Sequence, residues 1–194
     1  EELCAGKKDI VIISSDHTRP VPSRVTMPIL LHHIHAAAPE ARVRILVATG
    51  MHRPSTHEEL VNKYGEEIVA NEEIVMHVAT DDSMMKKIGT LPSGGECIIN
   101  KIAADCDLLL AEGFIEPHFF AGFSGSRKSV LPGIASYKTI MYNHNGQFVN
   151  DSHSRAGNLC HNHVSEDMFA AAEMAHLAFV LNVAVSYTHL RAHE

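Results

Sequence analysis

The sequence lacks the basic excess that nucleic-acid-binding and membrane-surface proteins carry. Lys and Arg number 16 against 23 Asp and Glu, and the formal net charge at pH 7 is -7. Proteins that hold nucleic acids or anionic membranes present a basic face to the phosphates, so we expect neither partner. No apolar run approaches the roughly 18 residues of a membrane-spanning helix, so we also expect no membrane insertion.

Cysteine is scarce and poorly spaced for pairing. The four cysteines lie far apart and form no C-x-x-C motif: Cys4, Cys97, Cys106 and Cys160. With no secretory leader before them, this pattern favours reduced thiols in a cytoplasmic protein over a disulfide framework or a zinc ribbon. Tryptophan is absent, whereas histidine is abundant, with 15 residues. Because histidine titrates near neutral pH and binds metals, the position of each one decides its meaning.

Short β-branched runs alternate with helix-like stretches, which is typical of parallel α/β architecture. We therefore expect an open, mostly parallel, Rossmann-like sheet with helices on both faces. A chain of 194 residues, 45% of them hydrophobic, is long enough to bury the core of such a domain. Strands are expected at Asp9–Ser15, Arg42–Ala48, Glu73–Ala79, Gly95–Lys101, Asp107–Glu112 and Leu177–Val183, and helices at Ser23–Ala38, Ser55–Tyr64, Tyr137–Asn143 and Asp167–Ala175.

Two segments break this alternation. Residues 113–133 mix glycine, proline, aromatic and basic residues and are too irregular for a buried element, so we interpret them as a long functional loop. Residues 184–194 resemble a tail that recurs on unrelated gene predictions. We expect this tail not to be native and leave it out of the functional interpretation.

Ligands in open α/β sheets bind beyond the carboxyl ends of the strands, so the turns there are candidate sites. The first such turn carries a carboxylate, an imidazole, a hydroxyl and a guanidinium: Asp16, His17, Thr18 and Arg19. In the second, Gly50 lets the backbone turn and His52 projects from the strand end. Taken alone, each turn also suits a structural role, in which Asp16 caps the next helix and Arg19 pairs with a surface acid. Two such turns at one sheet edge weaken that alternative.

The loop Glu116–Gly133 holds small residues, hydroxyls and two adjacent cations, Arg127 and Lys128. Backbone N–H groups and cations can together face an anion. The loop is no Walker A motif, because Arg127 stands where that motif needs glycine. The positive charge of Arg127 would lower the pKa of Lys128 and make its amine available as a nucleophile or covalent anchor. The alternative is a flexible loop with solvated cations, against which the run of three phenylalanines argues.

The remaining histidines carry weaker signals. His144, at an expected helix end, could bind nickel, zinc, copper or iron. For His161 and His163, and for the first-helix cluster His32, His33 and His35, a surface role is the better interpretation. No H-E-x-x-H or comparable set supports a zinc hydrolase.

Four segments together resemble the nickel-dependent lactate racemase family in order and spacing: Ser15–Pro20, Thr49–Pro54, Glu116–Gly133 and Asn143–His144. The resemblance covers the chain from about Asp9 to Val183. It implies that residues 1–183 are the N-terminal cofactor-binding and catalytic domain. Family enzymes have a second, C-terminal domain to which nothing here corresponds. We therefore expect this chain to be a truncated enzyme whose open half-site admits water.

The resemblance also implies a cofactor, the nickel-pincer nucleotide, which is a nickel(II) pyridinium-3,5-bisthiocarboxylate mononucleotide. In the family a loop lysine holds it through a thioamide bond, and Lys128 is the matching position. His144 matches the histidine that completes the nickel coordination. The nucleotide contacts fall on Asp16, His17, Thr18 and Arg19. The two acid–base histidines match His52 and His118.

The implied activity is racemisation of a 2-hydroxy acid, with lactate as the default substrate. One histidine takes the hydroxyl proton while the α-hydrogen leaves as hydride to the cofactor, and two bases serve the two enantiomers. Arg19 could also orient the substrate carboxylate. The alternatives are an epimerase of another 2-hydroxy acid and a module that stores the nickel nucleotide without turnover. Cofactor biosynthesis proteins are the expected partners.

Overall fold

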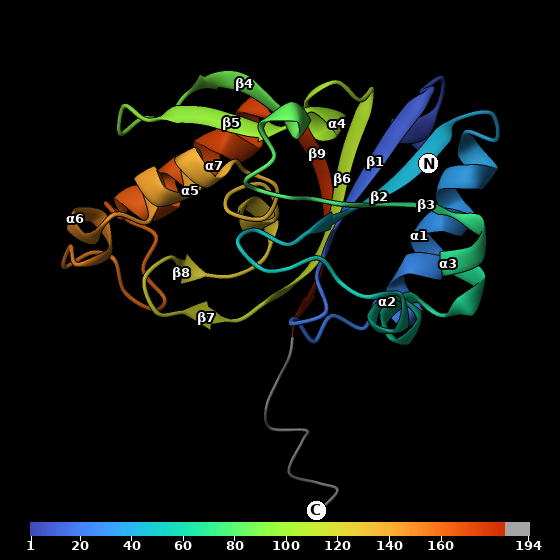
Figure 1. The fold of residues 1–194 in the computed structure, drawn as a ribbon, viewed down its shortest axis with the longest axis horizontal. Coiled ribbons are helices and arrows are strands. Elements are labelled where there is room, and N and C mark those ends of the chain that lie inside the picture. The colour runs from blue at the N-terminus through green and yellow to red at the C-terminus, as the bar shows by residue number, and fades with distance from the viewer. Residues whose placement is uncertain (185–194) are drawn as a thin grey trace, which may run out of the picture.

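The computed structural model of the chain describes residues 1–184 and places a five-stranded sheet at its centre. The strand order is β3-β2-β1-β6-β9, and every neighbouring pair is parallel. This confirms the expected open parallel sheet (Figure 1). The strands span Asp9–Ser15 (β1), Arg42–Ala48 (β2), Glu73–Met76 (β3), Leu108–Ile115 (β6) and Leu177–Ala184 (β9).

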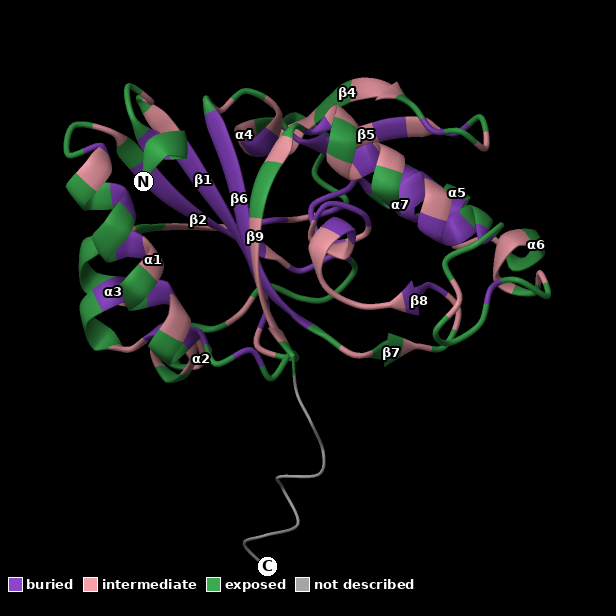
Figure 2. Cartoon of the chain, turned by 180° about the vertical axis from the view of Figure 1, so that it is seen from behind, coloured by how far each residue is buried: buried purple, intermediate pink, exposed green. Residues whose placement is uncertain are grey.

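Helices cover both faces of the sheet, as expected (Figures 1 and 2). One face carries α1 (Ser23–Ala37), α2 (His57–Tyr64) and α3 (Glu66–Asn71), and the other carries α4 (Lys101–Ala104), α5 (Tyr137–Asn143) and α7 (His163–Met174). Successive side chains of a strand point to opposite faces. In β1, Ile10 and Ile12 therefore pack with the α1 side, while Val11 and Ile13 pack with the α7 side. Both faces are buried, which explains why the strand is apolar nearly throughout.

A side-chain cap explains where α2 begins, whereas α1 begins without one. The helix α2 begins with a capping box, in which Thr56 accepts the Glu59 N–H and the Glu59 carboxylate accepts the Thr56 N–H. The helix α1 has Pro22 at its N-cap and no side-chain cap hydrogen bond. The Ser23 hydroxyl instead donates to the buried carboxylate of Glu112.

The strand expected at Gly95–Lys101 lies outside the main sheet. Residues Glu96–Asn100 form β5, which pairs antiparallel with β4 (Met85–Thr90), a strand that the sequence analysis did not find. The predicted helix Asp167–Ala175 begins four residues earlier, because Asn162 caps it through the Ser165 N–H. Short elements also missed are α3, α4, α6 (Gly146–Val149) and the 3-10 helices η1 (Glu2–Cys4) and η2 (Asp82–Met84).

The loop of residues 113–133 is more ordered than expected. The strand β6 continues to Ile115, and β7 (Pro117–His118) and β8 (Gly122–Phe123) then form a small hairpin before the 3-10 helix η3 (Ser126–Ser129). Ala121, Val130 and Leu131 are fully buried. The prediction that this segment is too irregular to be buried was therefore wrong, because apolar residues at its centre and end anchor it to the core.

The ends and the cysteines complete the comparison with expectation. Of the predicted tail, Ala184 ends β9, and residues 185–194 lie outside the described part of the chain. Within residues 1–184 all four cysteines are free thiols, and no helix is both long and apolar enough to cross a membrane.

The order of the strands fixes where a ligand can bind. The chain builds outward from β1 to β2 and β3 and then returns to the other side of β1 with β6. Between β1 and β6 the direction of winding reverses, and open α/β sheets bind ligands in the crevice outside the carboxyl ends of strands at such a point.

Candidate active site

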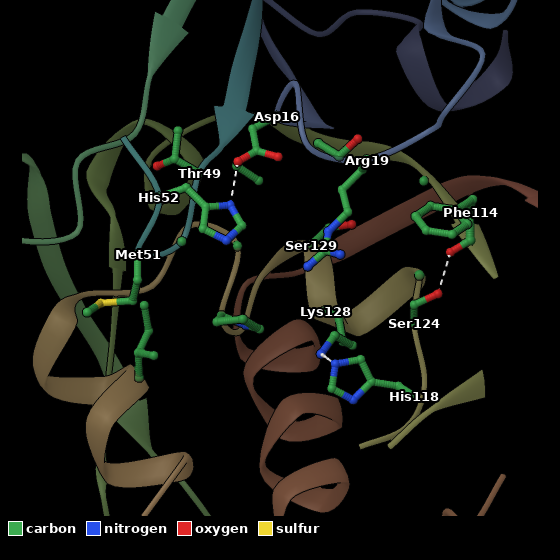
Figure 3. A pocket seen from close by; sticks show the side chains of 18 of the residues that line it. Asp16, Arg19, Thr49, Met51, His52, Phe114, His118, Ser124, Lys128 and Ser129 are labelled. Atoms are coloured by element: carbon green, nitrogen blue, oxygen red, sulfur yellow. Dashed lines mark hydrogen bonds and ion pairs between the residues drawn. The ribbon is translucent and has the colours of Figure 1, made fainter. Parts of the chain in front are cut away.

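A pocket lies at that point, beyond the carboxyl ends of β1, β2 and β6 (Figure 3). It brings together six of the eight residues singled out from the sequence: Asp16, Arg19, His52, His118, Lys128 and His144. Thr18 and His17 are not among the described residues that line it. Four chain segments that are separate in sequence thus meet at one edge of the sheet.

The turn after β1 and the turn after β2 are joined by an aspartate–histidine pair. The His52 Nδ1 lies 2.6 Å from Asp16 Oδ2, with the His52 side chain 48% exposed and that of Asp16 only 2%. Burial disfavours the charged carboxylate, but hydrogen bonds from Thr18 and His52 outweigh it and hold the pKa of Asp16 below its ordinary value. Asp16 is therefore ionised and accepts a hydrogen bond from the Nδ1–H of His52, which leaves Nε2 as the ring nitrogen with a free lone pair.

Thr18 and His17 support this turn from outside the pocket. Both the N–H and the hydroxyl of Thr18 donate to Asp16 Oδ1, at 3.1 and 2.6 Å. The His17 Nδ1 lies 2.9 Å from the Ser55 hydroxyl and 3.7 Å from a Glu59 carboxylate oxygen. Asp16 therefore does not cap α1, and the alternative of a capped turn is wrong.

The opposite wall carries a lysine–histidine pair. Lys128 Nζ lies 3.1 Å from His118 Nε2, and the Ala121 N–H donates to His118 Nδ1 over 3.3 Å. A ring that accepts at Nδ1 carries its proton on Nε2, and that proton can be donated only to an amine with a free lone pair. These partners therefore assign a neutral imidazole next to an unprotonated amine.

Burial and neighbouring charges explain this neutral pair. Burial, with the positive charges of Arg19 and Arg127, lowers the pKa of Lys128 to about 7. Burial and the charge of Lys128 lower the pKa of His118 to about 4. The Lys128 amine also lies 5.6 Å from the centre of the Phe120 ring. The alternative of solvated cations in a flexible loop is thus wrong for Lys128.

Arg127 does not point into the pocket as Lys128 does. Its guanidinium is buried, donates to the Ala121 and Phe123 carbonyls at 2.8 and 3.2 Å, and stacks on Phe169 of α7. It faces the protein interior rather than the pocket, so the expectation that two adjacent cations face one anion was wrong. Arg127 fastens the loop, and its charge contributes to the lowered pKa of Lys128.

His144 follows α5 and completes the pocket. Its ring packs edge-on against Phe120, with centroids 5.1 Å apart, and among the described residues its buried Nδ1 has no hydrogen-bond partner. Burial and the charge of Lys128 lower its pKa to about 4. A neutral imidazole with an unpaired buried nitrogen is suited to bind a metal ion, which would satisfy that nitrogen.

Glu112, which no sequence pattern singled out, is a buried carboxylate that lines the pocket. It accepts hydrogen bonds from the hydroxyls of Ser14, at 2.8 Å, Thr26, at 2.6 Å, and Ser23. These bonds tie β6 to β1 and to the first turn of α1, and so fix the turn between them. A charged residue inside the apolar run of Asp107–Glu112 was the signal that could have revealed it.

The other histidines lie away from the pocket. His33 pairs with Glu1 and His35 with Glu72 on the surface of α1, while His161 and His163 are exposed. Within the described residues no group of three His, Cys, Asp or Glu side chains is arranged to hold a metal ion by itself. The surface interpretation of His33, His35, His161 and His163 agrees with this arrangement.

Comparison with known proteins supplies the family context. Residues 1–157 match the family described as the lactate racemase N-terminal domain. A curated lactate racemase of Lactiplantibacillus plantarum is 72% identical over 183 residues, which are 94% of this chain and 43% of that protein. One from Thermoanaerobacterium thermosaccharolyticum is 54% identical over 97% of this chain and 44% of that protein. The chain thus spans less than half the length of these relatives.

Solved structures agree with the fold. The lactate racemase apoprotein from Thermoanaerobacterium thermosaccharolyticum superposes with a TM-score of 0.94 at 54% identity, over 97% of this chain and 45% of that chain. A protein from Thermotoga maritima superposes with a TM-score of 0.77 at 21% identity, over 96% of this chain and 49% of that one. At that identity the second likeness shows the fold alone.

Proposed function

Because the chain belongs to the lactate racemase family through its N-terminal domain, we propose that it is the cofactor-binding and acid–base part of a 2-hydroxy-acid racemase. The substrate that we propose is lactate, interconverted between its D and L forms. The curated relatives carry the name of this activity. The pocket supplies the groups that such a reaction needs, namely two imidazoles, a buried amine and a guanidinium.

The cofactor that we propose is the nickel-pincer nucleotide, attached to Lys128 and coordinated through His144. When bound, it would accept the substrate α-hydrogen as hydride and return it. Two features suit this group. An amine whose pKa is about 7 is about half unprotonated near neutral pH, and the unprotonated form can make a covalent bond. The buried and unpaired Nδ1 of His144 belongs to an imidazole that burial holds neutral, which is the form that binds metals.

The chain's own residues would handle the hydroxyl proton and the carboxylate of the substrate. His52 would take the proton on Nε2, and the ionised Asp16 at its Nδ1 would stabilise the resulting imidazolium. Arg19 lines the same pocket and would bind the substrate carboxylate through paired hydrogen bonds. His118 would serve as the second base once the Lys128 amine has left its Nε2 and the ring proton has moved from Nε2 to Nδ1, where it replaces the 3.3 Å bond from the Ala121 N–H.

The strongest support is that His52 and His118 line one pocket from different elements, the turn after β2 and the strand β7 (Figure 3). The two enantiomers present their hydroxyl groups to opposite sides, so a racemase needs a base on each side. A module that only stores the cofactor has no use for two bases. We therefore favour the racemase over the storage module.

Intact-mass and metal analysis tests the proposal. The chain, extended to the length of its curated relatives, would be produced together with the cofactor biosynthesis proteins that we propose as its partners. We expect a cofactor-sized adduct on Lys128, bound nickel, and interconversion of D- and L-lactate. The matched control is Lys128→Arg, which keeps a cation but offers no amine for the bond, and which we expect to carry no adduct.

An unmodified Lys128 in a nickel-free protein would contradict the cofactor assignment. An adduct without turnover of lactate would leave two possibilities, which a panel of other 2-hydroxy acids separates. Turnover of one of them would identify an epimerase or racemase of another substrate, whereas no turnover of any would favour the storage module.

A further inference from the structure

The turn that presents Lys128 contains a residue in a backbone conformation that L-amino acids rarely adopt. Ser126, the first residue of η3, has a φ of 45°. This left-handed region brings Cβ close to the following carbonyl oxygen, so an L-residue there needs support from its surroundings. Lys128 lies two residues further on in the same 3-10 helix, and its N–H donates to the Gly125 carbonyl over 3.0 Å.

One side chain from a distant strand supplies that support. Asn182 of β9 accepts the Ser126 N–H at 3.3 Å and donates to the Ser126 hydroxyl at 2.8 Å. The two bonds use the oxygen and the nitrogen of the Asn182 amide, and the N–H and the hydroxyl of Ser126. A side chain that forms hydrogen bonds with both the backbone and the side chain of Ser126 fixes the conformation of that residue, which packing alone would not do.

Two glycines make room for the Asn182 side chain and its two hydrogen bonds. Gly113 is the register partner of Asn182 on β6, and a Cβ there would lie 3.3 Å from Asn182 Oδ1. Gly125 has a φ of 74°, and its Cβ would lie 2.8 Å from the same oxygen and 2.9 Å from the Phe114 carbonyl. Asn182 therefore reaches the turn because Gly113 on β6 and Gly125 in the loop carry no side chain that would block it.

The other end of the loop is tied separately. Ser124 donates from its hydroxyl to the Phe114 carbonyl and accepts the Glu116 N–H, both at 2.9 Å. These bonds fasten the loop to β6 but stop before Ser126. The bonds from Asn182 are the ones that reach the residue from which η3 starts and hence set the direction of Lys128.

We propose that Asn182 is a positioning residue that fixes the left-handed turn at Ser126 and so directs the Lys128 amine into the pocket toward His118. The catalytic relevance of this residue rests on the proposed function of Lys128. The role of Asn182 in fixing the turn does not rest on that function, and it is tested below without cofactor. Asn182 also lies beyond residues 1–157, the part that matches the family domain.

The test measures the turn and the amine in the full chain. Hydrogen exchange by mass spectrometry would follow residues 125–129, with β1 as the reference. Competitive labelling with acetic anhydride would follow the reactivity of Lys128 relative to Lys138, whose side chain is 72% exposed and paired with Glu96. The variants are Asn182→Ala, Asn182→Asp, and Asn182→Ala combined with Ser126→Gly.

For Asn182→Ala we expect exchange of residues 125–129 to be roughly five to twenty-five times faster, since each lost neutral hydrogen bond changes an opening equilibrium by roughly fivefold. Exchange of β1 should not change, and the Lys128 to Lys138 labelling ratio should change at least threefold. Asn182→Asp keeps acceptors for the Ser126 N–H and hydroxyl and should stay within twofold. Ser126→Gly should recover at least half of the change, because glycine adopts this φ without strain.

Exchange and labelling like those of the original chain in Asn182→Ala would overturn the proposal. So would faster exchange spread equally over β1 and the turn, because that pattern indicates general destabilisation rather than positioning. If Asn182→Ala does not fold, the contrast between Asn182→Asp and Asn182→Leu, which keeps bulk but loses both bonds, decides in the same way. None of these results depends on whether Lys128 binds a nickel nucleotide, so a failure here is distinguishable from a failure of the proposed function.

Discussion

The two histidines of the pocket lie in opposite electrostatic surroundings. His52 lies at the pocket mouth, half exposed, with an ionised and buried carboxylate at its Nδ1. His118 is enclosed by aromatic rings, one of them Phe119 stacked at 4.8 Å, and has Lys128 at its Nε2. A carboxylate thus lies beside the first ring, whereas burial and the neighbouring amine disfavour an imidazolium at the second.

This difference bears on how one pocket can serve two mirror-image substrates. Two equivalent bases would treat the enantiomers alike, whereas these two differ in exposure and in the charge of their partners. Burial, and then the positive charge of Lys128 when it is protonated, lower the pKa of His118. A covalent bond at Lys128 would prevent that amine from taking up a proton, so attachment of the proposed cofactor would itself raise the pKa of His118 toward its ordinary value.

The largest expected effect comes from removing either base. In the cofactor-loaded chain extended to the length of its relatives, His52→Ala and His118→Ala should each slow racemisation in both directions by about a hundredfold or more. Each turnover uses one base to take the proton and the other to return it. Chiral chromatography of D- and L-lactate would measure both rates. The control is His32→Ala on the surface of α1, and a tenfold or smaller loss in either pocket variant would mean that one base serves both enantiomers.

A smaller effect is expected for Asp16→Asn. The amide would not stabilise the imidazolium and would favour the wrong tautomer, so kcat should fall by roughly tenfold to a hundredfold with little change in KM. In a His52→Ala background the same change should have almost no further effect, because Asp16 acts through His52. An equal loss in both backgrounds would instead indicate that Asp16 contacts the cofactor, as the family resemblance implies.

The third prediction concerns Lys128 in the cofactor-free chain. Because its pKa is lowered to about 7, labelling of its amine by acetic anhydride should rise steeply through pH 7 and level off above pH 8. Lys138 serves as the exposed reference in the same sample. Arg19→Ala removes a nearby positive charge and should move the midpoint to higher pH. A midpoint unchanged by this substitution would show that Arg19 does not act on the amine.

The smallest effect is on stability in acid. The unfolded chain protonates His118 near pH 6.5, whereas the folded protein does so only near pH 4. Above pH 6.5 neither state binds this proton, so the stabilisation is complete there and is lost as the pH falls from 6.5 to 4. Urea titrations at several pH values should show a shallower loss for His118→Asn than for the original chain. His32→Asn provides the exposed control, and equal slopes in all three would contradict the buried, neutral His118.

Local patterns predicted much of the fold because parallel α/β elements are encoded locally. The apolar runs of β1 and β2 have the predicted bounds, and helix α2 ends at Tyr64 as expected. The antiparallel pair β4–β5 was missed because its strands mix charged and apolar residues and its partner choice is non-local. The direction of Arg127 was also missed, since its partners on β8 and α7 come from contacts that no spacing shows.

The site was predictable in its members but not in its pairs. The turns after β1 and β2 bring Asp16 and His52 together because Ser15 and Ala48 are register partners at the ends of those strands. A prediction of register would have indicated that contact. Lys128 meets His118 only when the β7–β8 hairpin has formed, and Asn182 bonds to Ser126 only when β9 is paired with β6. No local signal predicts either.

The position of Asn182 in the chain has a consequence for biogenesis. A protein emerges from the ribosome N-terminus first, so Lys128 leaves the exit tunnel before the strand β9, which carries Asn182. Until β9 has emerged and paired with β6, the turn at Ser126 lacks both bonds from Asn182. If Lys128 takes the proposed nickel nucleotide, a protein that delivers it would therefore meet a chain in which β9 is already paired with β6, and covalent loading would report that synthesis has passed β9.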